Sequence, residues 1–283
     1  MIKVLKSGLY SSIQDLGRKG FRKYGVPVAG VMDIASAELG NLILGNDEND
    51  AVLEITMQGP RLQFFEPTNI SITGANLGPT KNEIPIEMNT NISIQHRDIL
   101  DFGTPKFGVR SYLAIKGGFQ TDKIFGSRSF YKNITEKDRI EIGDELTYRL
   151  FAPNESTVAI EIAPKVITKN ELIVFKGPEF ELLNGEQKQL LFSGPFTLAM
   201  NNRMGYQIKE LLPNNLKSIL STTVLPGTVQ LTPSGKMIIL MRDCQTTGGY
   251  PRILQLAEAS INHLAQKRQF ENISFSFLDQ SLF

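Results

Sequence analysis

Short apolar runs rich in β-branched residues recur along the chain, and glycine, proline, asparagine or aspartate separates them. The clearest runs are residues 51–55, 69–73, 91–94, 111–115, 157–162 and 172–175. Several of them alternate apolar and polar positions, which predicts half-buried β-strands. Many short strands with closely spaced turn residues are typical of barrels and sandwiches, not of alternating β–α–β units. The pattern therefore predicts a mainly β protein.

Two segments carry a helical pattern instead. In residues 33–44, Asp33 is a suitable N-cap, apolar side chains follow at helical spacing, and Gly45 ends the segment. In residues 251–267, Pro251 suits the first turn. Five apolar residues then fall at helical spacing, namely Ile253, Leu254, Ala257, Ile261 and Leu264. We therefore expect one main helix in each half of the chain.

The best domain junction is the sequence Ala-Pro-Asn-Glu-Ser at residues 152–156, which is short and polar. A chain of 283 residues also has the length of two modest domains. We predict an N-terminal domain at residues 1–152 and a C-terminal domain at residues 153–283, each built mainly from strands.

Charge and hydropathy exclude several classes of protein. Thirty basic and twenty-nine acidic residues leave no positive excess for a nucleic-acid-binding face. The longest apolar run, residues 237–241, is far shorter than a membrane span. Residues 1–6 lack the apolar core of a signal peptide and predict a first strand. We expect a cytoplasmic protein that binds neither nucleic acid nor membrane, and its single Cys244 excludes an internal disulfide.

Familiar nucleotide and metal motifs are absent from the sequence. It has no Walker A loop, and neither His96 nor His263 has another ligand residue at metal-binding spacing. Cys244 has no obvious histidine base, so a buried thiol is expected rather than a nucleophile. The Ala-Met-Lys-Met type of sequence that carries biotin is also absent, so we expect no biotin on this chain.

The first candidate site is residues 12–18, where an amide, a carboxylate and a guanidinium follow closely in Gln14, Asp15 and Arg18. The simpler interpretation is a turn in which Asp15 pairs with its own backbone, and the pattern alone favours it. Glu54 lies within an apolar strand and can be its outward residue. If it points inward it needs a partner such as Arg18 or Arg110, because an unpaired buried charge is very costly.

The second candidate follows the apolar strand 237–241, where the chain changes abruptly to polar residues and glycine. Its members are Arg242, Asp243, Cys244, Gln245, Thr246, Thr247, Gly248, Gly249 and Tyr250. Glycine lets the backbone approach a ligand, and amides at the start of the predicted helix suit a carboxylate or another anion. The two threonines serve equally well as simple caps. A ligand site and plain capping are both open on the pattern.

The third candidate is Arg203, in the turn of residues 201–206 before a strand. Its guanidinium suits a bidentate contact with a carboxylate. A solvated turn is the simpler interpretation of the same residues.

Several motifs, in order and over almost the whole chain, resemble one protein family. They occupy residues 12–20, 25–33, 40–46, 53–54, 59–60, 108–118, 126–127, 203–206, 226–230 and 243–251. The sequence is identified by them as a member of the KipA/PxpC family, which contains the C subunits of 5-oxoprolinases. The same family includes allophanate-hydrolase-subunit-2-like proteins and the carboxyltransferase part of urea carboxylase.

The resemblance implies a fold, partners and an activity. The fold would be two cyclophilin-like β-barrel domains. The partners would be a KipI/PxpB-like subunit, in a hetero-oligomer for which two plus two is one candidate stoichiometry, and a PxpA-like subunit. The complex would open 5-oxoproline to glutamate with ATP as co-substrate, and this chain would be inactive alone. It departs from the family at residues 136–141, 200–202 and 221–222, which bears on the choice of substrate.

A lactam hydrolase needs a cation for the substrate carboxylate, donors for the carbonyl oxygen and a base for water. We assign Arg203 as the cation and either Asp243 or Asp15 as the base. The remaining candidate substrate-binding residues are Gln245, Thr246, Thr247, Gly248, Gly249, Tyr250, Gln14 and Gln230. This hypothesis requires residues 14–18 and 243–250 to open into one accessible cleft.

Two other functions are compatible with the same resemblance. One is the carboxyltransferase module of a biotin-dependent system of the urea carboxylase or allophanate type. The other is a KipI-binding regulator of a sporulation histidine kinase, without catalysis. Biotin carrier and biotin carboxylase genes nearby would favour the first, whereas PxpA- and PxpB-like neighbours would favour the oxoprolinase.

Overall fold

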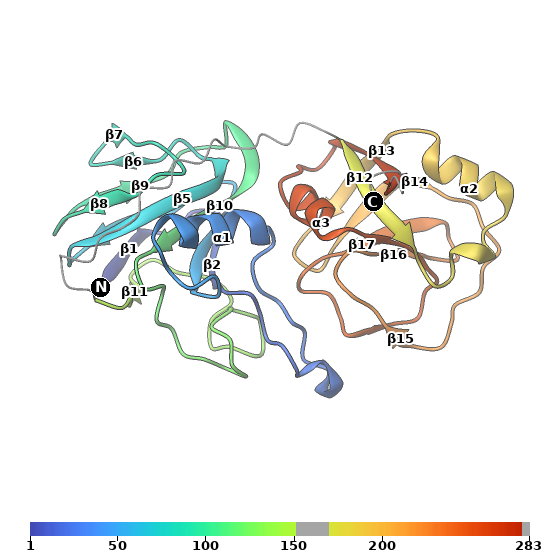
Figure 1. Ribbon diagram of the computed structural model, residues 1–283, viewed down its shortest axis with the longest axis horizontal. Helices are drawn as coiled ribbons and strands as arrows, with labels where there is room; N and C mark the ends of the chain where they lie inside the picture. The colour runs from blue at the N-terminus through green and yellow to red at the C-terminus, as the bar shows by residue number, and fades with distance from the viewer. Residues whose placement is uncertain (151–169, 279–283) are drawn as a thin grey trace. The chain divides into compact units, whose positions relative to one another are not determined.

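The computed structural model describes residues 1–150 and 170–278, which are mainly β-structure, as the sequence predicted (Figure 1). The chain divides into two compact units. The N-terminal unit contains Met1–Arg18 and residues 29–150, and the C-terminal unit contains Lys19–Val28 and residues 170–278. Lys19–Val28 belong to the C-terminal unit although they lie early in the sequence, so no single boundary in the chain separates the two units. The predicted junction at residues 152–156 and the predicted strand at 157–162 lie outside the described residues.

The strands of the N-terminal unit form two sheets. The six-stranded sheet has, in order, β11 (Glu145–Leu146), β1 (Ile2–Lys6), β4 (Arg61–Phe64), β9 (Ile99–Asp101), β6 (Thr80–Lys81) and β7 (Ile84–Pro85). The five-stranded sheet has, in order, β2 (Tyr10–Gln14), β3 (Val52–Thr56), β10 (Phe107–Ile115), β5 (Thr68–Asn76) and β8 (Ile92–Ile94). All the described pairs in both sheets are antiparallel.

The main core of this unit lies between the two sheets. Ile2 and Phe64 of the six-stranded sheet and Leu53 and Leu113 of the five-stranded sheet belong to one buried cluster. A second, smaller cluster lies between the five-stranded sheet and helix α1 (Ile34–Ile43), which packs on β5 and β10. Alternation of side chains along each strand therefore gives the five-stranded sheet two buried faces.

Helix α1 confirms the helix predicted at residues 33–44. Asp33 is its N-cap and accepts a 3.1 Å hydrogen bond from the backbone N–H of Ser36. Gly45, in the left-handed region at φ 61°, follows the last turn. Both signals are local, which is why the sequence located this helix well.

The C-terminal unit contains a closed barrel, as the family resemblance implied for this half of the chain. Around the barrel the order is β12 (Glu171–Lys176), β19 (Arg252–Leu256), β16 (Thr228–Leu231), β17 (Lys236–Leu240), β14 (Gly205–Leu211), β13 (Phe196–Asn201) and β20 (Asn272–Phe277). The parallel pair β12–β20 closes it. A separate two-stranded sheet consists of β15 (Thr222–Thr223) and β18 (Thr247–Gly248).

The helix predicted at residues 251–267 is wrong in its first half. Residues Arg252–Leu256 are strand β19, and only Glu258–Ala265 form a helix, α3. The apolar residues of the strand fit a helical spacing by chance, and their pairing with β12 and β16 decides the outcome. The amides of Gly248 and Gly249 consequently do not lie at a helix start.

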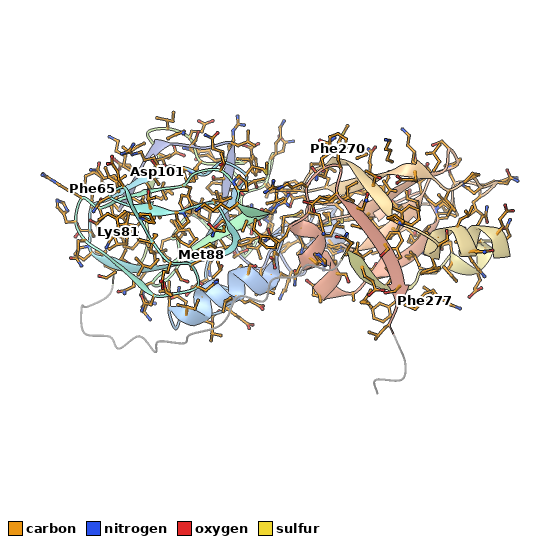
Figure 2. The ribbon with its side chains drawn as sticks, turned by 90° about the horizontal axis from the view of Figure 1, so that it is seen from above. Phe65, Lys81, Met88, Asp101, Phe270 and Phe277 are labelled. Atoms are coloured by element: carbon orange, nitrogen blue, oxygen red, sulfur yellow. The ribbon has the colours of Figure 1, made fainter. Side chains whose placement is uncertain are left out.

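The C-terminal unit also has a second helix, α2 (Gly185–Phe192), so this half has two helices of eight residues each where the sequence predicted one main helix. Asn184 and Gln187 form a capping box at its start. At its end Phe192 packs on Phe277, with ring centroids 4.5 Å apart, and Phe277 is labelled in Figure 2. Short one-turn helices occur at η1 (Arg22–Tyr24) and η2 (Phe180–Leu182). No helix of residues 1–150 or 170–278 is long and apolar enough to cross a membrane.

Candidate functional site

The segment predicted as the main site leaves β17 and crosses to β18 in the C-terminal unit. Asp243 and Arg203 form a bidentate ion pair there, with Nε–Oδ2 and Nη2–Oδ1 distances of 2.8 and 2.9 Å. Both side chains are about nine-tenths buried. The backbone N–H of Asp243 also donates to the carbonyl oxygen of Arg203 at 2.9 Å. The pair thus joins the 241–244 turn to the 201–206 turn.

This pairing changes two predicted roles. The Arg203 guanidinium uses its Nε and Nη2 groups on Asp243 rather than on a substrate carboxylate. Both oxygens of Asp243 accept from Arg203, so this carboxylate is not a free base. Arg203 and Asp243 are 40 residues apart in sequence and were therefore predicted as separate candidates.

Gln230 of β16 is 98% buried, yet its side-chain Nε2 donates no hydrogen bond to any described residue. It lies against Gly248, since a Cβ on that glycine would be 2.4 Å from Nε2. Thr222 is the strand partner of Gly248, and its buried hydroxyl also has no partner among the described residues. Two buried hydrogen-bonding groups without a described partner therefore occur at this sheet, one against Gly248 and one on the residue that pairs with it.

The other residues predicted in this segment lie around the same short sheet. The carbonyl oxygen of Thr246 accepts from the backbone N–H of Val224 at 3.2 Å, and that of Gly249 accepts from Ile219 at 2.9 Å. Thr247 and Tyr250 are exposed, and Gln245 is half-buried. None of these threonines caps a helix, because the segment enters a strand.

Two residues of this region did not emerge as candidates from the sequence. Thr222 was noted only as a departure from the family pattern. Arg22, in the part of the chain that belongs to the C-terminal unit, donates to the carbonyl oxygens of Val224 and Thr246. A guanidinium that holds two backbone carbonyls fixes the position of the β15–β18 sheet. No local sequence signal indicates either contact.

In the N-terminal unit, Asp15 forms the turn that the simpler interpretation predicted, and more. Its carboxylate accepts from the backbone N–H of Gly17 at 2.8 Å and from that of Arg128 at 2.7 Å. The hydroxyls of Ser127 and Ser129 donate to Oδ1 at 2.6 and 2.7 Å. With four donors and 4% exposure, Asp15 organises two loops and is not placed as a free base.

Gln14 and Glu54 are also part of this internal frame. Gln14 is fully buried, and its Nε2 donates to the hydroxyl of Ser12 at 2.9 Å. Glu54 points inward and accepts from the backbone N–H of Met32 at 2.7 Å, with Arg110 Nε at 3.8 Å. The conditional prediction of Arg110 as a partner of Glu54 is therefore confirmed. Gln14 and Asp15 belong to the N-terminal unit, and one cleft shared with residues 243–250 stays a prediction.

The thiol and imidazole groups agree with structural roles. Burial raises the pKa of the Cys244 thiol to about 11, so it is protonated at neutral pH and a poor nucleophile. Burial, together with the nearby Lys267, lowers the pKa of His263 to about 4. His96 is exposed and lies 2.8 Å from the carbonyl oxygen of Phe65 through Nδ1. Within residues 1–150 and 170–278 there is no cluster of three or more histidine, cysteine or acidic residues suited to a metal ion.

Two curated relatives match nearly the full chain. The 5-oxoprolinase C subunit of Escherichia coli is 31% identical over 94% of this chain and 87% of its own length. The 5-oxoprolinase C subunit of Haemophilus influenzae is 31% identical over 97% of this chain and 90% of its own length.

Solved structures show the same fold within longer proteins. TTHA0988 superposes with a TM-score of 0.89 at 27% identity, covering 97% of this chain and 55% of that chain. The urea carboxylase of Kluyveromyces lactis also gives 0.89, at 26% identity, covering 99% of this chain and 28% of that chain. The chain thus spans about half of TTHA0988 and less of the urea carboxylase.

A family model, that of the carboxyltransferase domain, subdomain A and B, matches residues 24–277. This match covers most of both units and every candidate residue of the C-terminal unit, and it begins after Gln14 and Asp15 of the N-terminal unit. Together with the two relatives, it confirms the resemblance seen in the motifs. The chain belongs to the carboxyltransferase domain family, subdomains A and B, together with the C subunits of 5-oxoprolinases.

Proposed function

We propose that this chain is the cytoplasmic C subunit of an ATP-dependent 5-oxoprolinase, which hydrolyses 5-oxoproline to glutamate together with PxpB-like and PxpA-like subunits. The supporting observation is its 31% identity to two 5-oxoprolinase C subunits over at least 87% of their lengths. Because the match covers most of this chain and most of each relative, it favours the same role for the whole protein over a module that they merely share.

The chemistry explains why ATP would be consumed. A lactam carbonyl is a poor electrophile, and transfer of the γ-phosphoryl group of ATP to its oxygen would activate it and release ADP. Water would then add to the carbonyl carbon, and the carbon–nitrogen bond would break to leave γ-glutamyl phosphate. A second water would release phosphate and glutamate. Hydrogen-bond donors at the carbonyl oxygen and at the substrate carboxylate stabilise such charge changes.

Within this chain, Gln230 and Thr222 are our choice for these donors. Gln230 Nε2 is buried against Gly248, the Thr222 hydroxyl is buried on the strand that pairs with Gly248, and neither is used by the described residues, which is costly unless something else accepts from them. An amide N–H and a hydroxyl suit a carbonyl or carboxylate oxygen. The Arg203–Asp243 pair then has a positioning role, because it holds the turn that precedes β18. The base would come from another group.

The test is reconstitution of the three subunits with 5-oxoproline and ATP. Glutamate and ADP should form in equal amounts with all three subunits present, and neither should form when this chain is omitted. The chain alone should be inactive. Glutamate release at the full rate without this chain would contradict the proposal.

A second candidate is the carboxyltransferase module of a biotin-dependent enzyme. The observation in its favour is the superposition of 99% of this chain on the urea carboxylase of K. lactis with a TM-score of 0.89. In that case carboxybiotin should be consumed only when the chain and an acceptor such as urea are both present. A regulator would instead bind the PxpB-like subunit and leave both assays without turnover.

A further inference from the structure

The N-terminal unit contains a polar pocket of about 760 Å³ that the proposed reaction does not use. Its walls come from separate parts of the chain, namely Asp15 after β2, residues 45–51 after α1, residues 116–117 after β10, the 120–128 loop and Arg149. A volume of this size is in the range of small-molecule sites.

Hydrogen bonds connect these walls into a fixed frame. The side chain of Asn46 donates to the carbonyl oxygen of Ile115 at 2.8 Å and accepts from the backbone N–H of Gly117 at 2.9 Å. Gln120 Nε2 donates to the carbonyl oxygen of Gly117 at 2.9 Å. Arg128 Nη2 in turn donates to Gln120 Oε1 at 2.6 Å. The pocket is therefore formed before any ligand arrives, which lowers the cost of binding.

The charges around the pocket favour an anion. Four cationic side chains line it, those of Lys116, Lys123, Arg128 and Arg149. Three carboxylates also line it, but Asp15 gives its oxygens to four internal donors. Burial raises the pKa of Asp50 above its usual range, and its Oδ2 accepts from the backbone N–H of Asp47 at 3.2 Å. Asp47, on the exposed rim, is the remaining acidic residue.

One of the four cationic side chains, that of Lys123, has no described interaction that stabilises the fold. Lys123 is exposed and makes no hydrogen bond or ion pair with any residue in the described ranges. Lys116, by contrast, donates through Nζ to the carbonyl oxygen of Leu44 at 2.9 Å and so stabilises the end of α1. Arg128 already donates to the carbonyl oxygen of Thr121 and to Gln120, so it contributes positive charge, and Lys123 at the rim is the donor available to a phosphoryl group.

We propose that this pocket binds a phosphate group, either as free inorganic phosphate or as part of a small phosphorylated molecule. The inference rests on the pocket of the N-terminal unit alone and does not depend on the activity proposed above. The ligand is a compact, doubly charged oxyanion that contacts Lys123 and is attracted by the charges of Arg128 and Arg149.

The experiment is titration of the full chain with inorganic phosphate and, separately, with ADP, followed by calorimetry. Lys123→Ala should weaken binding about tenfold, the effect of losing one charge-assisted hydrogen bond. Lys217→Ala is the matched control, because Lys217 is also exposed and lies outside the pocket. It should leave the affinity unchanged. Circular dichroism checks that each variant is folded.

A second variant tests the sign of the effect. The side chain of Asp47 accepts from the backbone N–H of Asn49 at 2.9 Å, and Asp47→Asn keeps that acceptor while removing the charge. Phosphate should then bind about threefold more tightly, since a like charge has been removed. Tighter binding of ADP than of phosphate would assign the site to a nucleotide. Equal affinity for both would show that the pocket recognises only the phosphate group. The absence of binding by both, equal losses in Lys123→Ala and Lys217→Ala, or weaker binding in Asp47→Asn would overturn the proposal.

Discussion

Two sets of buried polar side chains, one in each unit, differ in what they bind. In the N-terminal unit, the carboxylate of Asp15 accepts four hydrogen bonds, and Glu54 pairs with a backbone N–H and with Arg110. In the C-terminal unit, Gln230 and Thr222 bury donors that the described residues leave unused. Buried polar groups are normally satisfied, so the first set serves the fold and the second is available to a ligand.

This difference separates residues that the sequence presents as equals. Gln14 and Gln230 were both predicted to line the substrate pocket. The Nε2 of Gln14 donates to the Ser12 hydroxyl and to the carbonyl oxygen of Phe130. The Nε2 of Gln230 lies against Gly248 and donates to no described residue. The two glutamines can be distinguished only when the hydrogen-bond partners of each side chain are known from the structure.

The largest effect is expected from breaking the buried pair of the C-terminal unit. Arg203→Ala leaves Asp243 buried without its partner, which costs about 3–5 kcal/mol of unfolding free energy. The double variant Arg203→Ala with Asp243→Ala should be less destabilised than the sum of the two single variants. Urea unfolding measures all three, and strictly additive losses would contradict a direct pair.

A slightly smaller loss is expected in the frame of the N-terminal unit. Asp15→Asn replaces one accepting oxygen by an amide donor that faces the N–H of Arg128, at a cost of about 2–3 kcal/mol. The exposed Asp47→Asn is the control and should change stability by less than about 0.5 kcal/mol. Equal stability of the two variants would show that Asp15 is not part of a frame.

The buried Nε2 of His263, in the C-terminal unit, also lacks a described partner, but this side chain is not part of the candidate site. Its folded pKa of about 4 lies below the unfolded value near 6.5, so its contribution to stability is full above about pH 6.5. That contribution is lost as the pH falls towards 4, by about 2 kcal/mol. His263→Gln should flatten the pH dependence of unfolding in this window. The same slope in both proteins would disprove a buried neutral imidazole.

The smallest of these effects concerns the glycine beside Gln230. Gly248→Ala places a methyl group 2.4 Å from Gln230 Nε2 and should lower kcat/KM for 5-oxoproline about tenfold in the reconstituted enzyme. Gly249→Ala is the matched control, because its nearest contact is a carbonyl oxygen at 3.5 Å. If both variants lose activity equally, the position of Gln230 is not what matters.

Local signals made part of the fold predictable. Asp33 and Gly45 mark the two ends of α1, and alternating apolar positions mark most strands. The strand β19 was mistaken for helix because five residues are too few to separate the two periods. Helix α2 was missed because it is largely polar and offers no apolar stripe.

The candidate site was predictable only in its location. The change from apolar to polar residues after residue 241 indicated the right segment, and Gln230 was named within the pocket. The pairing of Arg203 with Asp243 and the approach of Thr222 to Gly248 depend on residues 40 and 26 positions apart, respectively, that the strand pairing brings together. Such contacts leave no trace in residue spacing.

The most direct test compares Gln230→Leu and Thr222→Val with the unmodified chain in the three-subunit enzyme. The account predicts a drop of about tenfold or more in kcat/KM for 5-oxoproline with melting temperatures nearly unchanged, because neither side chain supports the described fold through a hydrogen bond. Full activity in both variants, or losses that merely follow a loss of folded protein, would contradict it.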